Sequence, residues 1–229
     1  NRQNAGIRCA ADDVIEVARP TGELLYVREF SGADEAHDWP DLHDPDIPDV
    51  AFGYHAPDVF HIEVRSPLEV AVASGTVLPD NSTVSADVEL RLPDQPFDGF
   101  RYGLIANADD SGFLAFTVQD QLATDGQRTL AWCVSRGQSA LVAPGLTSGL
   151  AESPADECVR QGSLEVDDFR HPLAIKFSNG QAEFFIGETS VDSIPETVRP
   201  AATFGFILQN FVDSLLSHAH YDNLAVISS

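Results

Sequence analysis

Two carboxylates with the potential for acid–base chemistry lie in one strand-like run of the sequence. Asp87 and Glu89 alternate with apolar residues between positions 83 and 92, so they point to the same side of an extended chain. Cleavage of a glycosidic bond needs two carboxylates that face each other across that bond. Asp87 and Glu89 instead stand beside Arg91 on one strand, which is typical of a solvated outer face. We therefore predict no catalytic residue.

Two histidines near the C terminus alternate with an aspartate. His218, His220 and Asp222 project to one face if this segment is extended. Two histidines and one carboxylate can bind zinc or another transition metal. A polar strand edge explains the same three residues, and we favour this interpretation.

Aromatic side chains are the third group, because sugars bind against aromatic rings that have polar neighbours. Trp39, Tyr102 and Trp132 are the candidates for ligand binding. Trp39 lies in a segment rich in Asp and His, and exposed aromatic residues of loops are good ligand contacts. Trp132 lies in the middle of an apolar run, where a core position explains it equally well.

The three cysteines bear on the compartment in which the protein works. Cys133 ends an apolar run, and a disulfide with Cys158 would close a loop of 24 intervening residues. Disulfides form and persist in oxidising compartments, so we predict the Cys133–Cys158 bond in a secreted or cell-surface protein. Two buried reduced thiols are the alternative. Cys9 is left over, as a free thiol or an intermolecular link.

The charge of the chain limits its partners. Its 13 Lys and Arg residues stand against 36 Asp and Glu residues, which gives a formal net charge of −23. Such a surface repels phosphate backbones and anionic lipid headgroups, so we expect no nucleic acid and no membrane surface as a partner. No apolar run approaches the length of a membrane-spanning helix, and we expect no direct membrane insertion.

Two further features suit an exported protein. The sequence contains no Met and begins with Asn1, so we expect that an N-terminal signal or anchor has been removed, although a shortened chain would look the same. Asn81-Ser82-Thr83 matches the N-glycosylation sequon.

Strand signals dominate the 229 residues. Residues 83–92 alternate between apolar and polar side chains, which is typical of an antiparallel strand with one buried face. Asn179-Gly180 stands between two alternating runs and predicts a hairpin. About eleven such runs predict an all-β, two-sheet sandwich. We expect one domain over residues 1–229, with a core at about 24–227, long loops at 31–57 and 137–162, and at most one helical turn near 212–216.

Several local patterns together resemble the concanavalin A-like lectin and glucanase jelly rolls, including laminin-G and DUF1080-like domains. Residues 100–116 resemble a hairpin of that family, residues 82–91 the strand before it, and residues 173–187 a later hairpin. Tyr221-Asp222-Asn223 resembles the start of the closing strand. The resemblance covers roughly residues 25–227 in the family's own order.

The resemblance implies a module that binds glycans or serves as a structural or interaction subunit of a surface assembly. Some relatives are glycoside or 3-keto-disaccharide hydrolases, so a carbohydrate-active hydrolase is the alternative. The glucanases carry their catalytic carboxylates on one strand as Glu-x-Asp-x-(x)-Glu, and this sequence has no such run. The resemblance also implies a structural calcium where the first and last strands meet, with Glu29 and Asp222 as ligands. Alternatively, Asp222 only accepts hydrogen bonds from backbone amides.

Overall fold

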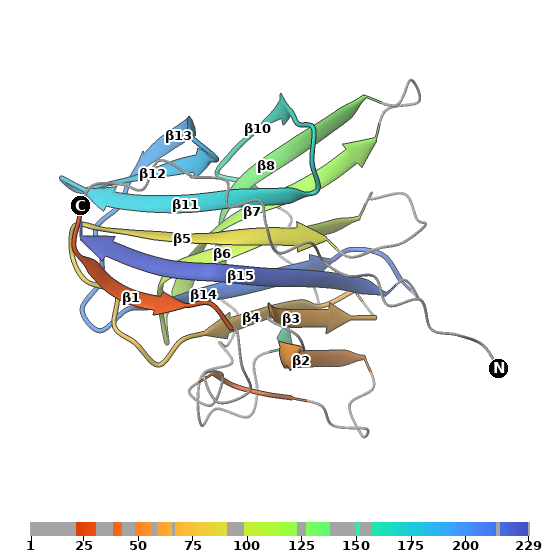
Figure 1. Ribbon diagram of the computed structural model, residues 1–229, viewed down its shortest axis with the longest axis horizontal. Helices are drawn as coiled ribbons and strands as arrows, with labels where there is room; N and C mark the ends of the chain where they lie inside the picture. The colour runs from red at the N-terminus through yellow and green to blue at the C-terminus, as the bar shows by residue number, and fades with distance from the viewer. Residues whose placement is uncertain are drawn as a thin grey trace.

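The computed structural model describes residues 22–30, 39–42, 49–55, 59–65, 67–90, 99–122, 127–137, 150–151, 157–213 and 216–228. These residues form two antiparallel β-sheets that pack face to face, and none of them lies in a helix (Figure 1). In this part of the chain there is accordingly no helix that could span a membrane. The sandwich predicted from the alternation is confirmed.

The first sheet has eight strands, in the order β13-β12-β11-β5-β15-β3-β2, with β1 paired to β15 beside β3. Their bounds are β1 Leu24–Arg28, β2 Val50–His55, β3 Val59–Val64, β5 Ser82–Leu90, β11 Arg170–Ser178, β12 Gln181–Ile186, β13 Thr189–Pro195 and β15 Ser217–Ser228. The last strand of the chain therefore lies inside this sheet, between β5 on one side and β1 and β3 on the other.

The second sheet has seven strands, in the order β10-β8-β7-β6-β14-β4-β9. Their bounds are β4 Glu69–Ala73, β6 Phe100–Asp109, β7 Gly112–Leu122, β8 Arg128–Gly137, β9 Leu150–Ala151, β10 Arg160–Glu165 and β14 Thr203–Asn210. Strand β9 lies at one edge, and β10 lies at the opposite edge beside β8.

The clearest sequence signals give the elements that they predicted. In β5 the even-numbered residues from Val84 to Leu90 are buried, whereas the odd-numbered residues from Ser85 to Glu89 are partly exposed. Asn179 and Gly180 have φ values of 52° and 73°, so both residues adopt the left-handed conformation that a tight hairpin turn between β11 and β12 requires.

The expected long loops are partly wrong. Strand β2 lies within the segment 31–57, while β9 and the first residues of β10 lie within 137–162. Strand β10 is mostly exposed and polar because it is an edge strand, so its sequence shows no alternation of buried and exposed positions. Val212 and Asp213 are not helical, and the centre of the expected helical turn lies outside the described residues.

Aromatic rings fill the space between the sheets. The ring of Phe206 in β14 stacks on Tyr221 of β15, with ring centroids 4.4 Å apart, and on Trp39 at 5.1 Å. Phe60 of β3 lies 5.6 Å from the same ring. Because Phe206 belongs to one sheet and both Phe60 and Tyr221 to the other, this cluster joins the two layers.

We predict that Phe206→Ala lowers the free energy of unfolding by about 3–5 kcal/mol, since it leaves a cavity among rings that are fully buried. Urea denaturation measures the change. Phe169→Ala is the matched control, because Phe169 precedes β11, is only partly buried and lies under the guanidinium of Arg128. Equal losses for the two variants would contradict this account of the core.

Candidate functional site

A hollow of about 460 Å³ lies on the outer face of the seven-stranded sheet, over β6, β7, β8 and β10. In β7 the side chains of Phe116 and Val118 belong to the core, so alternation turns Thr117 and Gln119 to the outer face. The residues that line the hollow are Arg101, Thr117, Gln119, Gln121, Ala131, Trp132, Cys133, Cys158, Gln161, Gly162 and Ser163.

Strand register brings the polar groups of the hollow together. Thr117 of β7 pairs with Cys133 of β8, which pairs with Gln161 of β10. Two residues further along β7, Gln119 pairs with Ala131 of β8, and Ala131 pairs with Ser163 of β10. Polar side chains of β7 and β10 therefore face each other across β8. Between them, β8 presents only the small side chain of Ala131 and the disulfide sulfur of Cys133.

Arg101 supplies the only charge among the residues that line the hollow. Its guanidinium lies 4.8 Å from the centre of the Phe211 ring, and its Nη1 donates to Cys133 Sγ at 3.8 Å. No Asp or Glu is among these lining residues. The hollow can donate and accept hydrogen bonds, but within the described residues it has no carboxylate pair for acid–base hydrolysis.

The disulfide predicted from the sequence is confirmed. Cys133 and Cys158 are bonded, with a Cα–Cα distance of 5.4 Å. The bond ties the segment before β10 to β8 and forms part of the wall of the hollow. Since disulfides persist in oxidising compartments, the bond agrees with an exported protein. Cys9 lies outside the described residues.

Two of the three aromatic candidates are buried away from the hollow, and the third borders it. Trp39 was expected in an exposed loop, but its side chain is only 5% exposed because it packs on Phe206. Tyr102 is fully buried. Trp132 borders the hollow, yet it belongs to the main core and is 8% exposed, because alternation turns Ala131 and Cys133, not Trp132, outward. These rings serve the core, so the expected ligand contacts are wrong for Trp39 and Tyr102.

A buried polar network lies on the inner side of the same strands. The hydroxyl of Tyr102 donates to Asp120 Oδ2, and His171 Nε2 of β11 lies 3.0 Å from Asp120 Oδ1. Burial and the neighbouring carboxylate raise the pKa of Tyr102 well above its ordinary value, so the phenol remains a donor. The network links both sheets beneath the hollow.

Sequence reasoning missed the polar residues of this region, although a signal was present. Within the apolar run of β7, Thr117, Gln119 and Gln121 stand at alternate positions, and Asp120 interrupts the buried face. A charged residue at a core position indicates a buried partner, but the sequence does not say that the partner is His171.

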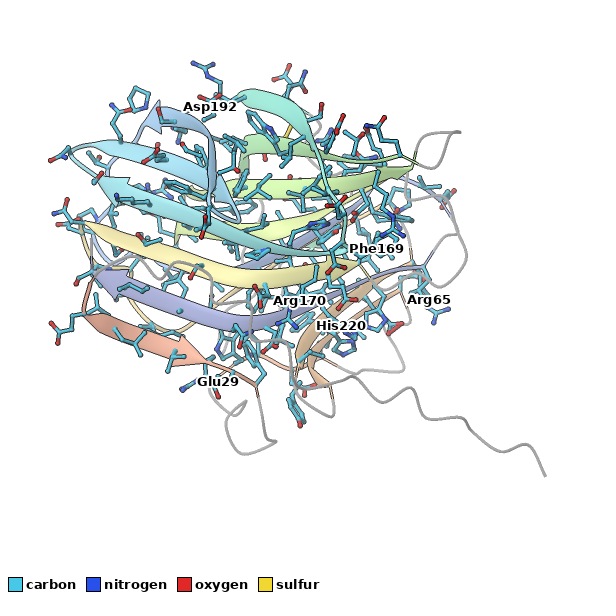
Figure 2. All side chains as sticks on the ribbon, turned by 45° about the horizontal axis from the view of Figure 1, so that its top comes forward. Glu29, Arg65, Phe169, Arg170, Asp192 and His220 are labelled. Atoms are coloured by element: carbon cyan, nitrogen blue, oxygen red, sulfur yellow. A yellow bond between two sulfur atoms is a disulfide. The ribbon has the colours of Figure 1, made fainter. Side chains whose placement is uncertain are left out.

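The outer face of the eight-stranded sheet carries the carboxylates expected there. Asp87 and Glu89 are partly exposed, as predicted, but their expected neighbour Arg91 lies outside the described residues. Instead, Arg170 of β11 donates to Asp87 Oδ2 from Nη2 at 2.6 Å and from Nε at 3.1 Å. Figure 2 shows Arg170 on this face.

The calcium predicted at Glu29 and Asp222 stays a prediction. Glu29 is exposed directly after β1, and Arg28 before it pairs with Leu224, close to Asp222 in the chain. Asp222 accepts a hydrogen bond from the Asn223 backbone amide at 2.7 Å, as the alternative expected, and lies 3.2 Å from Arg170. Among the described residues, no three His, Cys, Asp or Glu side chains are already arranged to hold a metal ion.

The glycosylation candidate Asn81 is exposed in the turn before β5 and has a φ of 51°. Its modification also stays a prediction.

Comparison with known proteins defines the fold. No protein-family model and no curated protein matches the sequence. Among solved structures, the β-glucanase of Bacillus licheniformis superposes with a TM-score of 0.54 at 8% identity, over 92% of this chain and all of that one. The chain has a concanavalin A-like jelly-roll fold. At this identity, the likeness shows the fold alone.

Two other solved structures share the architecture. One is a functionally unknown protein from Saccharomyces cerevisiae, with a TM-score of 0.53 at 10% identity over 84% of this chain and 97% of that one. The other is the CBM2 module of the evolved Dit of Lactobacillus casei BL23 phage J-1, with a TM-score of 0.51 at 10% identity over 91% and 97%. The fold is thus shared by proteins whose names differ widely, so function must be argued from the site.

We predict that removing the disulfide with Cys158→Ser costs about 3 kcal/mol of unfolding free energy, the value that the chain-entropy model gives for a loop of this length. Urea denaturation under non-reducing conditions measures it. A reductant should lower the unfolding free energy of the wild-type chain by a similar amount and leave that of the variant unchanged. An unfolding free energy of the wild-type chain that does not change with the reductant would contradict the prediction.

For calcium, we predict a thermal midpoint that falls by several degrees with a chelator, recovers with Ca²⁺ and no longer responds in Asp222→Ala. Burial raises the pKa of Asp222 above its ordinary value. Protons therefore compete with Ca²⁺ for this carboxylate at pH values where an exposed Asp would already be ionised. The calcium response should therefore grow as pH rises through that pKa and vanish in acid. If the chelator does not change the thermal midpoint at neutral pH, only the alternative remains, in which Asp222 accepts hydrogen bonds from backbone amides.

Proposed function

We propose that the protein is a non-catalytic module of an extracellular or cell-surface protein, and that it binds an uncharged glycan in the hollow on the seven-stranded sheet. The observation that carries this proposal is the lining of the hollow. It offers three glutamine amides, the hydroxyl of Ser163 and one guanidinium, and the lining residues include no carboxylate. Thr117 also lines the hollow, but its buried hydroxyl donates to the backbone carbonyl of Cys133.

The chemistry of these groups suits sugar hydroxyls. A hydroxyl both donates and accepts hydrogen bonds, and the amides of Gln119, Gln121 and Gln161 do the same. A chain with a formal net charge of −23 repels carboxylated or sulfated polysaccharides at long range, whereas a neutral glycan approaches without this cost. An uncharged ligand is therefore favoured over an acidic one.

Hydrolysis is the alternative function, and the arrangement of carboxylates argues against it. The three alternate positions of β7 that line the hollow carry Thr117, Gln119 and Gln121, which are all neutral. Asp87 lies on the other sheet and is bound to Arg170. We therefore expect binding without turnover.

The disulfide supports export, and a surface module that binds no small ligand is the remaining alternative. Such a structural subunit would use the same fold to contact another protein. Glycan binding distinguishes the two.

The test is an array of neutral oligosaccharides followed by calorimetry on each hit. We predict that Gln119→Ala and Gln161→Ala each weaken binding about tenfold, the cost of one or two lost hydrogen bonds. Gln181→Ala is the matched control, because Gln181 is an exposed glutamine of β12 on the other sheet.

Binding that survives both hollow variants would place the glycan elsewhere, and an empty array would favour the structural subunit. Release of sugar from any bound glycan, lost on Asp87→Asn or Glu89→Gln, would overturn the non-catalytic assignment.

A further inference from the structure

A second, smaller hollow of about 370 Å³ lies where β8 begins and β10 ends. The residues that line it are Gln127, Arg128, Glu165, Val166 and Asp167. Figure 2 labels Phe169 in the short connection from β10 to β11, just beyond these lining residues. None of the five lines the first hollow, so this end of the sheet holds polar groups that the proposed site does not use.

Strand register makes the two hollows neighbours. Gln121 of β7, which lines the first hollow, pairs with Thr129 of β8, and Thr129 pairs with Glu165 of β10, which lines the second. Along β10, Ser163 of the first hollow and Glu165 of the second are two residues apart, about 7 Å in an extended strand. One row of paired residues therefore borders both hollows.

The joining row faces the same way as the first hollow. Leu130 belongs to the main core and Leu164 packs against it. Because side chains of a strand alternate, Thr129 and Glu165 point to the outer face of the sheet. Thr129 is partly exposed and Glu165 is exposed, so a ligand can reach both residues.

Together the two hollows form a path along the strands rather than across them. The residues that line this path run from Cys133 to Gln127, a separation of six residues that spans about 20 Å in an extended chain. A single sugar ring is much shorter than this path. The shape therefore suits a linear chain of several rings.

Named contacts hold the walls of the second hollow. The guanidinium of Arg128 lies 3.6 Å from the centre of the Phe169 ring. Val166 packs against the main core, and its backbone amide donates to the carbonyl of Arg128 at 3.4 Å. Gln127 Nε2 donates to Glu165 Oε1 at 2.7 Å. Side chains that are already held in place lose less freedom when a ligand binds.

The second hollow differs from the first in its hydrogen-bonding groups. Glu165 and Asp167 are exposed carboxylates, which only accept hydrogen bonds. A carboxylate has about four acceptor positions, so Glu165 can accept from Gln127 and from a ligand hydroxyl together. Sugar hydroxyls are suitable donors, and hydrogen bonds to an ionised group are the stronger kind. An acidic sugar would instead meet two like charges here.

We propose that the second hollow is a further subsite for the same glycan, so that the ligand is a linear, uncharged polysaccharide whose chain runs along β8 and β10 through both hollows. This inference rests on the proposed function, because the first hollow holds part of the same chain. Glu165 and Asp167 accept hydrogen bonds from the rings at one end, while Gln119 and Gln161 bind the rings in the first hollow.

The experiment measures affinity against chain length by calorimetry. The probes are β-1,4- and β-1,3-linked glucose chains and β-1,4-linked mannose chains of two to six rings. The six-ring chain of the polymer that binds should bind at least about tenfold tighter than the two-ring chain. Glu165→Ala and Asp167→Ala should each weaken the six-ring chain about tenfold and leave the two-ring chain unchanged, whereas Gln119→Ala should weaken both.

Glu188→Ala is the matched control. Glu188 is an exposed carboxylate between β12 and β13 on the other sheet, so this variant removes the same charge away from the path. It should leave the affinity for every chain length unchanged. An equal loss in Glu188→Ala and Glu165→Ala would overturn the subsite.

A further variant tests the path between the hollows. Thr129→Tyr places a large side chain, of a residue type that strands favour, in the joining row. The affinity for the six-ring chain should then fall to that for the two-ring chain. If the six-ring chain binds this variant as well as the wild type, the chain does not cross the row and the proposal is wrong.

A last measurement uses only the wild-type chain. The backbone amide signals of Val166 and Asp167 should shift with the six-ring chain and not with the two-ring chain. Affinity that does not grow with length would overturn the subsite and leave the proposed function standing, whereas no binding of any chain at any length would overturn both. Release of shorter chains that is lost in Glu165→Ala would make the second hollow catalytic and also overturn the subsite.

Discussion

Aromatic rings that stack between the two sheets determine which face of the sheet the neighbouring side chains on the same strand point to. Phe206 lies between Trp39 and Tyr221, with ring centroids 5.1 and 4.4 Å away. Because side chains of a strand alternate, an inward ring fixes the outward direction of its neighbours. Tyr221 inward places His220 outward, and Phe116 inward places Thr117 in the hollow. The direction of the side chains that line the hollow therefore depends on core residues, such as Phe116, that do not line it.

The two outer faces have different chemistry. On the seven-stranded sheet, the polar hollow lies over β6, β7, β8 and β10, and a second apolar cluster occupies neighbouring positions of the sheet. Its members are each at most 3% exposed and comprise Ala71, Ala73, Ile105, Ala108, Phe113, Ala115 and Ile207. The eight-stranded sheet instead exposes paired charges, with Arg170 between Asp87 and Asp222. A ligand that needs hydrogen bonds and a ligand that needs negative charge would thus meet opposite sides of the molecule.

Local patterns were enough to predict the sandwich, because alternation in β5 and the Asn179-Gly180 turn are properties of contiguous residues. Edge strands were missed where they are polar: β10 exposes most of its residues, so nothing in its sequence marks one face. Trp39 was placed wrongly since its acidic sequence neighbours suggested a surface loop, whereas packing on Phe206 is a contact between distant segments. The proximity of three histidines has the same origin. His218 and His220 stand on one strand, and the register of β3 on β15 brings His61 beside them.

The negative charge of the chain and the lining of the hollow act at different ranges. A formal net charge of −23 repels an acidic polysaccharide as it approaches, and physiological salt limits the reach of this repulsion to about 8 Å. Within the hollow, Arg101 is the only charged lining residue, so hydrogen bonds to the glutamine amides decide which neutral glycan stays bound. The charge of the chain therefore selects against acidic ligands, and the lining selects among neutral ones.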